Sequence, residues 1–294
     1  MRTYIVPVDF SASSNLALDY AIARARRRNA KLVLLHVLSI NALIAASSDS
    51  SGSAELVIKA QESARENARS VMRKLVKRKG LSAKEYRVVF IENLDTANAI
   101  AAQARKSRAR IIIMGSEGRR GIRRLFAGSV AEATLRATRR PMLIVKRSNL
   151  TKPPAKTILV PIDFSKVSEV ALKRAKAIAK TEKEALLLLN VVTDPEHVVP
   201  FYLREEYYSS LIRSEGERIK RLARQIGIAP RQYRSLVIRD RDAARAIANQ
   251  AKKSRVSMIV IGSHGRSGLK HMVLGSVAEK TLRYATCPVL VFKK

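Results

Sequence analysis

An internal repeat constrains the fold of this chain more than any other feature of its sequence. The segment Val6–Ser11 (VPVDFS) recurs 154 residues later as Val160–Ser165 (VPIDFS). Further along, the offset becomes 147, so the copies differ in length within a loop. The repeat predicts two domains at 1–148 and 156–294, because Pro153-Pro154 interrupts any regular element near the seam.

Within each copy, short β-branched runs alternate with longer helical patterns, which is typical of βαβ units around a parallel sheet. Continuous apolar runs indicate strands that helices cover on both faces. The expected strands of the first copy are Tyr4–Val8, Leu32–Val37, Tyr86–Ile91, Arg110–Met114 and Met142–Lys146. Those of the second are Thr157–Ile162, Leu186–Val192, Tyr233–Ile238, Met258–Ile261 and Val289–Phe292.

The helices between these strands are amphipathic. Apolar residues from Leu18 to Ala25 recur at helical spacing, and the basic residues Arg24 and Arg26–Arg28 are expected on the solvent side and in the last turn. A long helix from about Glu55 is expected to end at Gly80, and its counterpart at Gly227, because glycine suits the left-handed conformation that closes a helix.

Charge is the unusual part of the composition. The chain has 57 Lys and Arg against 24 Asp and Glu, which gives a formal net charge of +33. Residues 1–150 contribute +18 of this charge and residues 151–294 contribute +15. A field of this sign attracts polyanions such as nucleic acid and anionic membrane surfaces. Charge alone identifies no partner.

Several classes of protein are disfavoured by the sequence. Apolar runs such as Ala185–Leu189 are shorter than the roughly 20 residues of a membrane span, and the first residues lack a signal-peptide core, so a cytoplasmic protein without a transmembrane segment is expected. Cys287 stands alone and the four histidines are scattered, so no disulfide and no metal site are expected. We also expect no catalytic residues, because no nucleophile with a paired base is visible.

Two glycine-containing loops have the sequence pattern that points most directly to a ligand site. In the first copy, the fourth strand is followed by Gly115-Ser116-Glu117-Gly118, then by nine residues and then by Gly128-Ser129. In the second copy, the fourth strand is followed by Gly262-Ser263-His264-Gly265, then by nine residues and then by Gly275-Ser276. Glycines permit positive φ and close approach to a ligand, and N–H groups at the next helix start favour an anion, with a serine hydroxyl as a further donor. The loops therefore predict phosphate sites.

The spacing is neither that of a Walker loop nor that of a Rossmann dinucleotide fingerprint. It resembles instead the universal stress protein family in its tandem form: G-x-x-G, nine residues and G-[ST] after a strand, V-P-x-D-F-S in the first strand, and a downstream Thr before Pro141 or Pro288. The resemblance covers nearly the whole chain, twice. It implies an α/β fold of two tandem doubly wound domains, each an open five-stranded parallel sheet flanked by helices, Rossmann-like and similar to adenine nucleotide alpha hydrolases.

The family resemblance also implies that each copy binds an adenine nucleotide at the carboxyl ends of its strands, where ligands of such sheets bind. ATP is expected, with AMP or ADP as alternatives and Mg²⁺ possible beside the nucleotide. The aspartates would meet the adenosine, the valines the base and the glycine loops the phosphates. The first site comprises Pro7, Val8, Asp9, Val37, Met114, Gly115, Gly118, Arg119, Gly128, Ser129 and Val130. The second comprises Pro161, Ile162, Asp163, Val191, Ile261, Gly262, Gly265, Arg266, Gly275, Ser276 and Val277.

Further expectations concern assembly and differences between the sites. The resemblance implies a pseudo-dimer of the two domains, to which Met142–Lys146 and Val289–Phe292 contribute, and a homodimer of whole chains. Glu117 stands where the second copy has His264, and a carboxylate beside phosphates costs Coulomb energy, so the second site is predicted to bind ATP more tightly.

Alternatives remain open from the residues themselves. Asp9 and Asp163 have the chemistry of helix caps, His36 that of a structural residue, and Phe201, Tyr202, Tyr207 and Tyr208 suit packing better than base stacking. The leading interpretation is a cytoplasmic ATP-binding stress-response regulator that acts through conformation or partner association. The alternatives are a nucleic-acid-binding protein with vestigial glycine sites and a slow ATPase, which lacks an evident general base.

Overall fold

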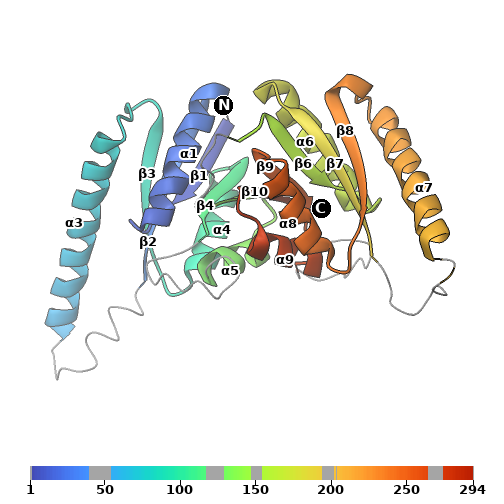
Figure 1. Ribbon diagram of the computed structural model, residues 1–294. Coiled ribbons are helices and arrows are strands. Elements are labelled where there is room, and N and C mark those ends of the chain that lie inside the picture. The colour runs from blue at the N-terminus through green and yellow to red at the C-terminus, as the bar shows by residue number, and fades with distance from the viewer. Residues whose placement is uncertain are drawn as a thin grey trace. The chain divides into compact units, whose positions relative to one another are not determined.

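The computed structural model describes residues 2–39, 54–116, 129–146, 154–193, 202, 204–263 and 274–293. The chain divides into two compact units, Met1–Val145 (unit 1) and Lys146–Lys294 (unit 2). Figure 1 shows the helices and strands of each unit. None of the described helices is both long and apolar enough to cross a membrane.

Unit 1 is a five-stranded parallel sheet with the strand order β3-β2-β1-β4-β5. Its strands are β1 (Arg2–Pro7), β2 (Ala30–Ser39), β3 (Tyr86–Asn93), β4 (Ile111–Gly115) and β5 (Met142–Val145). Its helices are α1 (Ala12–Arg28), α3 (Ala54–Arg78), α4 (Thr96–Lys106) and α5 (Ser129–Ala137).

Unit 2 repeats this arrangement with the strand order β8-β7-β6-β9-β10. Its strands are β6 (Thr157–Pro161), β7 (Ala185–Val192), β8 (Tyr233–Arg239), β9 (Met258–Gly262) and β10 (Val289–Phe292). Its helices are α6 (Lys166–Glu182), α7 (Arg204–Gln225), α8 (Ala243–Lys253) and α9 (Ser276–Tyr284), with a short 3₁₀ turn at Pro230–Gln232. The two units confirm the predicted fold class, two doubly wound α/β domains with five parallel strands each.

Helices cover both faces of each sheet. Right-handed crossovers from β1 to β2 and from β2 to β3 place α1 and α3 on one face, and the crossovers that lead to β4 and β5 place α4 and α5 on the other. In agreement, α4 packs on α5, whereas α1 packs on β1, β2 and β4. The central strands are buried, with Ile112 and Ile113 at 0% exposure, while the edge strand β3 is only half-buried.

Helix α1 illustrates how the pattern sets the packing. Its predicted apolar stripe, Leu18 to Ala25, is buried, and Ser11 caps its first turn. The expectation that Arg24 faces solvent is wrong, because Arg24 is 4% exposed. Arg24 follows the buried Ala17 by seven positions and Ala21 by three, so helical geometry puts it on the same face.

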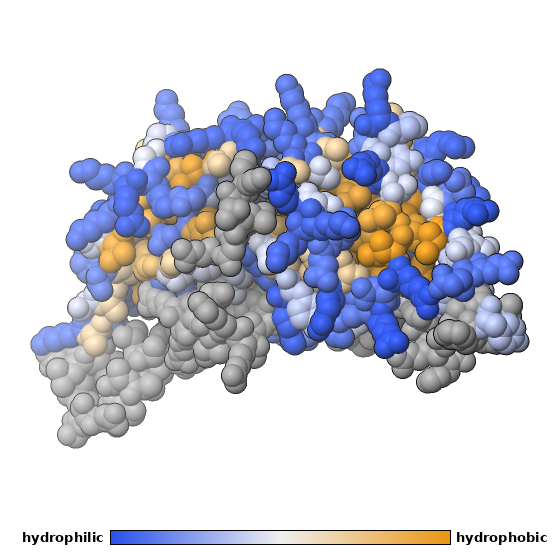
Figure 2. All heavy atoms as spheres, in the orientation of Figure 1, coloured by the Kyte–Doolittle hydropathy of each residue, from blue (hydrophilic) through white to orange (hydrophobic). Residues whose placement is uncertain are grey.

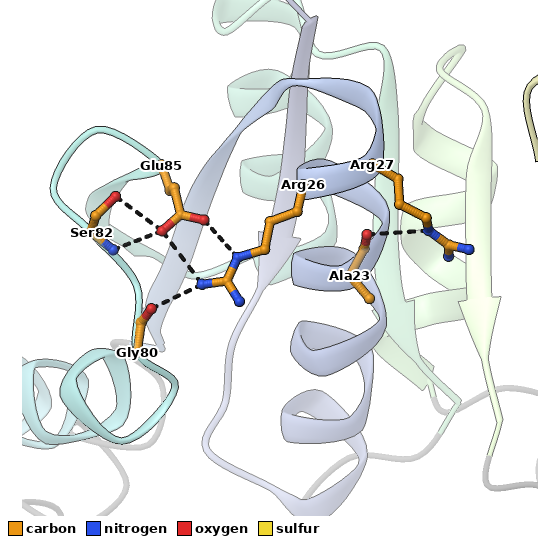
Figure 3. A network of polar contacts seen from close by, with 6 residues as sticks. All are labelled: Ala23, Arg26, Arg27, Gly80, Ser82 and Glu85. Atoms are coloured by element: carbon orange, nitrogen blue, oxygen red, sulfur yellow. Dashed lines mark hydrogen bonds and ion pairs between the residues drawn. The ribbon is translucent and has the colours of Figure 1, made fainter.

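The long helices end as the glycines predict. Gly80 has φ of 58° and Gly227 has φ of 72°, both left-handed. Beyond α3, a polar network ties α1 to the connection between α3 and β3 (Figure 3): Arg26 of α1 donates to Glu85 Oε1 at 2.7 Å and to the Gly80 carbonyl at 2.9 Å, and Ser82 donates to Glu85 Oε2. The Arg26 and Ser82 hydrogen bonds lower the pKa of Glu85 to about 2.

Candidate functional site

A tight turn after the first strand of each unit builds one wall of the site. In unit 2, Asp163 Oδ1 accepts a hydrogen bond from the Ser165 amide at 3.0 Å. Ser165 Oγ in turn accepts from the Ser168 amide at 3.2 Å and caps α6. Phe164 between them has φ of 62°, a left-handed conformation that costs energy in a residue other than glycine. Strain of this kind clusters at functional sites.

Unit 1 contains the same turn. Asp9 Oδ1 accepts from the Ser11 amide at 3.0 Å, Phe10 has φ of 64°, and Ser11 Oγ accepts from the Ser14 amide at 3.1 Å. The alternative that the aspartates cap the helices is therefore wrong, because the serines two residues later do so. Each aspartate instead orders the turn that holds its own carboxyl group at the strand end.

The neighbouring strand is tied to this turn by a side chain in both units. Asn190 Nδ2 donates to the Ile162 carbonyl at 2.7 Å. At the corresponding position, His36 Nδ1 lies 2.6 Å from the Val8 carbonyl, and because a carbonyl only accepts, this nitrogen carries the proton. The His36 ring also packs on Phe10 with centroids 4.6 Å apart. The structural interpretation of His36 is confirmed.

The first glycine of each loop serves the packing of a strand against a helix. A Cβ on Gly115 would clash with Ser13 Oγ and would lie 2.6 Å from both the carbonyl carbon and oxygen of Ser13, and a Cβ on Gly262 would lie 2.6 Å from Val167 Cγ1. Neither glycine has a positive φ, and Gly275 has φ of −64°. The expectation of left-handed glycines is wrong for these three: Gly115 and Gly262 are needed where α1 and α6 approach the strand ends, and Gly275 is the N-cap of α9 in an extended conformation.

The start of α9 presents backbone donors. Gly275 is the N-cap, its own amide donates to the Ser263 carbonyl at 2.7 Å, and no side chain among the described residues caps the helix. The amides of Ser276, Val277 and Ala278 form the first turn, whose N–H groups have no partner within an α-helix. With the positive end of the helix dipole, they favour an anion.

These elements surround one cavity in unit 2, with a volume of about 510 Å³. Ligand cavities in proteins are of this size, roughly 300–1,000 Å³. The cavity lies at the carboxyl ends of β6, β7 and β9, and β6 and β9 are the neighbours between which the strand order reverses. Ligands of doubly wound sheets bind at such a switch point.

The cavity brings together every described residue of the second predicted site. These residues are Pro161, Ile162, Asp163, Val191, Ile261, Gly262, Gly275, Ser276 and Val277. Gly265 and Arg266 lie outside the described residues, as does His264.

In unit 1 the described residues of the first predicted site occupy equivalent positions at the strand ends and at the start of α5. They are Pro7, Val8, Asp9, Val37, Met114, Gly115, Ser129 and Val130. Gly118, Arg119 and Gly128 lie outside the described residues, and so does Glu117, so the comparison of Glu117 with His264 stays a prediction.

Several lining residues were missed by the sequence reasoning. Those on α7 and α8 are Leu211, Glu215, Ala243 and Ile247. Glu215 is 8% exposed, its Oε1 accepts from Arg218 Nη1 at 2.5 Å, and its Oε2 is buried without a partner among the described residues. The available signal was the type of residue: a glutamate interrupts the apolar spacing of Leu211, Ile219 and Leu222 on α7.

The described aromatic residues before and within α7, Tyr202, Tyr207 and Tyr208, do not line the cavity. Tyr208 is 3% exposed, with the Arg239 guanidinium 3.8 Å above its ring and Tyr207 edge-on to it. Tyr208 therefore packs, as preferred from the sequence. Tyr202 is 82% exposed, and Phe201 lies outside the described residues.

The described residues contain no group of three or more metal-ligating His, Cys, Asp or Glu side chains. Burial raises the pKa of Cys287 to about 11, so its thiol stays protonated and unreactive at neutral pH.

Fold and cavity together define a class of protein, a tandem doubly wound α/β protein with a ligand-sized cavity at the carboxyl edge of a sheet. The model of the universal stress protein family matches residues 1–146 and again 154–293. The chain belongs to the universal stress protein family, as two consecutive domains.

This chain is similar to relatives that match about half of it and to relatives that match nearly all of it. A universal stress protein of Bacillus subtilis is 34% identical over 144 residues, which are 46% of this chain and 97% of the relative. A universal stress protein of Mycobacterium tuberculosis is 26% identical over 296 residues, or 99% of this chain and 96% of the relative. A solved structure of a universal stress protein from Archaeoglobus fulgidus has a TM-score of 0.68 at 21% identity, and the match covers 99% of this chain and 96% of that one. This last likeness concerns the fold.

Proposed function

We propose that this chain is a cytoplasmic stress-response regulator that binds an adenine nucleotide in the cavity of unit 2, and a second one at the equivalent position of unit 1. The bound nucleotide, ATP with AMP or ADP as alternatives, would bias conformation or association with partners. One observation carries the proposal: a single cavity of about 510 Å³ unites the Asp163 turn, the end of β7 and the uncapped start of α9.

The lining residues fit the two halves of a nucleotide. Ile162, Val191 and Ile247 supply apolar surface for a base, and Asp163 supplies a carboxylate beside it. The first-turn amides of α9 and the Ser276 hydroxyl supply donors for phosphates. Such a division, mainly apolar with a few convergent polar groups, is typical of ligand sites. Mg²⁺ would accompany the phosphates and neutralise part of their charge.

Blocking the cavity tests the proposal. Ala243 lines the cavity at the start of α8, so Ala243→Phe places a ring inside it, whereas Asn249→Phe adds the same ring to an exposed position of the same helix. We expect calorimetry with ATP to detect one site fewer in Ala243→Phe and an unchanged number in Asn249→Phe. Mass spectrometry of ligand released from the purified protein identifies the nucleotide. Unchanged binding in Ala243→Phe would refute the proposal for this cavity.

A second candidate function is binding to a polyanion such as nucleic acid. The net charge of +33 is spread over both halves of the chain, and hydrophilic side chains cover much of the face seen in Figure 2. Binding that depends on phosphate contacts weakens steeply as salt is added. RNA and DNA titrations at several salt concentrations test this function, and a flat response would exclude it.

We also propose that the chain forms a homodimer. The family resemblance implies a homodimer and a pseudo-dimer of the two domains. Sedimentation equilibrium of the whole chain measures the first, with twice the mass of 32.6 kDa as the expected result. A mass of one chain over the working concentration range would contradict it.

A further inference from the structure

We propose that Glu215 is a specificity residue of the unit 2 cavity, whose carboxylate accepts a hydrogen bond from a donor on the nucleoside half of the bound nucleotide. The inference rests on the proposed nucleotide binding. The donor is either a ribose hydroxyl or the exocyclic amino group of the base, which share this chemistry.

The Glu215 carboxylate is buried with half of its hydrogen-bonding capacity unused among the described residues. Glu215 lines the cavity, the residue is 8% exposed, and in the described part of the chain only one of its two carboxylate oxygens has a hydrogen-bond partner. Oε1 accepts from Arg218 at 2.5 Å, and Oε2 is buried with no hydrogen-bond partner among the described residues. Buried carboxylate oxygens without a donor are costly and rare. A ligand donor removes that cost on binding.

Glu215 lies in a different part of the cavity from the start of α9. Glu215 comes from α7, which packs against β7 and β8, whereas α9 follows β9. In the sheet, β6 lies between β7 and β9, so Glu215 and the α9 amides border different parts of the cavity. A carboxylate repels phosphate, and the α9 amides attract it. A nucleotide with its phosphates at α9 therefore turns its neutral, donor-bearing half towards Glu215.

The Arg218 contact holds the carboxylate in place. The guanidinium carbon of Arg218 lies 4.0 Å from the ring centroid of Phe164, the residue with left-handed backbone in the Asp163 turn. The Glu215 side chain is thereby linked, through Arg218 and Phe164, to the turn that forms the other wall of the cavity. A fixed acceptor discriminates among ligands better than a mobile one, because less conformational freedom is lost on binding.

Unit 1 lacks this group. At the offset of 147 residues, Ala68 corresponds to Glu215 and Val71 to Arg218. Ala68 is buried on α3, and its methyl side chain offers no acceptor at this position. The unit 1 site is accordingly expected to be indifferent to the donor that the unit 2 site selects, and the two sites differ in specificity.

The test follows the methyl NMR signal of Ile247, which lines the cavity and reports unit 2 alone. The probes are ATP, 2′-deoxy-ATP, 3′-deoxy-ATP and purine riboside triphosphate, of which the last lacks the amino donor. We expect one of the three analogues to bind about ten- to a hundred-fold more weakly than ATP, the usual effect of losing a hydrogen bond to a charged group. Which analogue is weakened identifies the donor.

Variants then assign the effect to Glu215. Glu215→Leu should bind ATP and the weakened analogue with equal affinity, whereas Glu215→Gln, which keeps an acceptor oxygen, should retain part of the preference. Equal binding of all four nucleotides by the unmodified chain would overturn the proposal. A preference for ATP that survives in Glu215→Leu would also overturn it. If no nucleotide shifts Ile247 at all, the proposed function itself fails.

Discussion

Adding one methyl group at Gly115 or Gly262 should destabilise the corresponding unit by different amounts. The alanine Cβ at Gly115 meets Ser13 Oγ, which can rotate away, and also the Ser13 carbonyl carbon and oxygen at 2.6 Å, atoms of the α1 backbone that cannot. At Gly262 the Cβ faces Val167 Cγ1 at 2.6 Å, and the nearest backbone atom is at 3.2 Å. Overpacking costs about 1–3 kcal/mol, so we expect about 3 kcal/mol for Gly115→Ala and about 1 kcal/mol for Gly262→Ala.

The nature of the facing atoms yields a matched control. Val167→Ala removes the methyl group that meets the new Cβ, so Val167→Ala with Gly262→Ala should recover most of the loss, with a coupling of about 1 kcal/mol in the double-mutant cycle. Ser13→Ala removes only the hydroxyl and leaves the backbone contact, so it should not rescue Gly115→Ala.

The assay must separate the units, because a two-domain chain need not unfold in one step. Native-state hydrogen exchange of amides in β4 and in β9 measures the free energy of opening in each unit. A cost below about 0.5 kcal/mol for Gly115→Ala, or its rescue by Ser13→Ala, would refute the packing role of these glycines.

Three further predictions concern local structure. Ser165→Ala removes the cap of α6 and should lower the free energy of unfolding of unit 2 by about 1 kcal/mol in urea, and an unchanged value would contradict the capping role. Glu85→Gln should be less stable than the unmodified chain at pH 7, because the pKa of Glu85 is about 2 in the folded state and ordinarily 4.5. This difference in stability should persist above pH 4.5 and disappear as the pH falls towards 2. A difference that stays constant across that range would be inconsistent with the role of the Glu85 carboxylate. In α7, Gly216→Ala should stabilise by about 1 kcal/mol because nothing lies within 4 Å of its Cβ, whereas Gly227→Ala should destabilise by about 1 kcal/mol because φ there is 72°, and thermal unfolding that shifts the same way for both would contradict this reasoning.

Much of the fold follows from the sequence because both copies repeat the same local pattern. Buried parallel strands are continuous apolar runs, and these are recognisable without knowledge of their neighbours. Asp163, Val191 and Ile261 all lie near the ends of such runs, and the carboxyl ends of parallel strands meet at one edge. Their convergence on one cavity was therefore predictable.

Other features depend on contacts between distant segments and were not predictable. Gly115 is needed because Ser13, about a hundred positions earlier, lies against it. Glu215 falls after the loop in which the two copies differ in length, and its counterpart is Ala68, so the repeat carries no signal for it. Arg24 looked solvent-exposed because its neighbours in sequence are basic, whereas burial on a helix is set by residues three and seven positions away.

The central claim is that the unit 2 cavity holds a nucleotide, and methyl NMR of the whole chain titrated with ATP tests it most directly. We expect the methyl signals of Ile162, Ile247 and Ile261, which line the cavity, to shift in parallel as ATP is added. Signals of Ile178 and Val256, buried residues that do not line the cavity, should stay in place. Shifts confined to residues away from the cavity, or no shift at saturating ATP, would contradict the account.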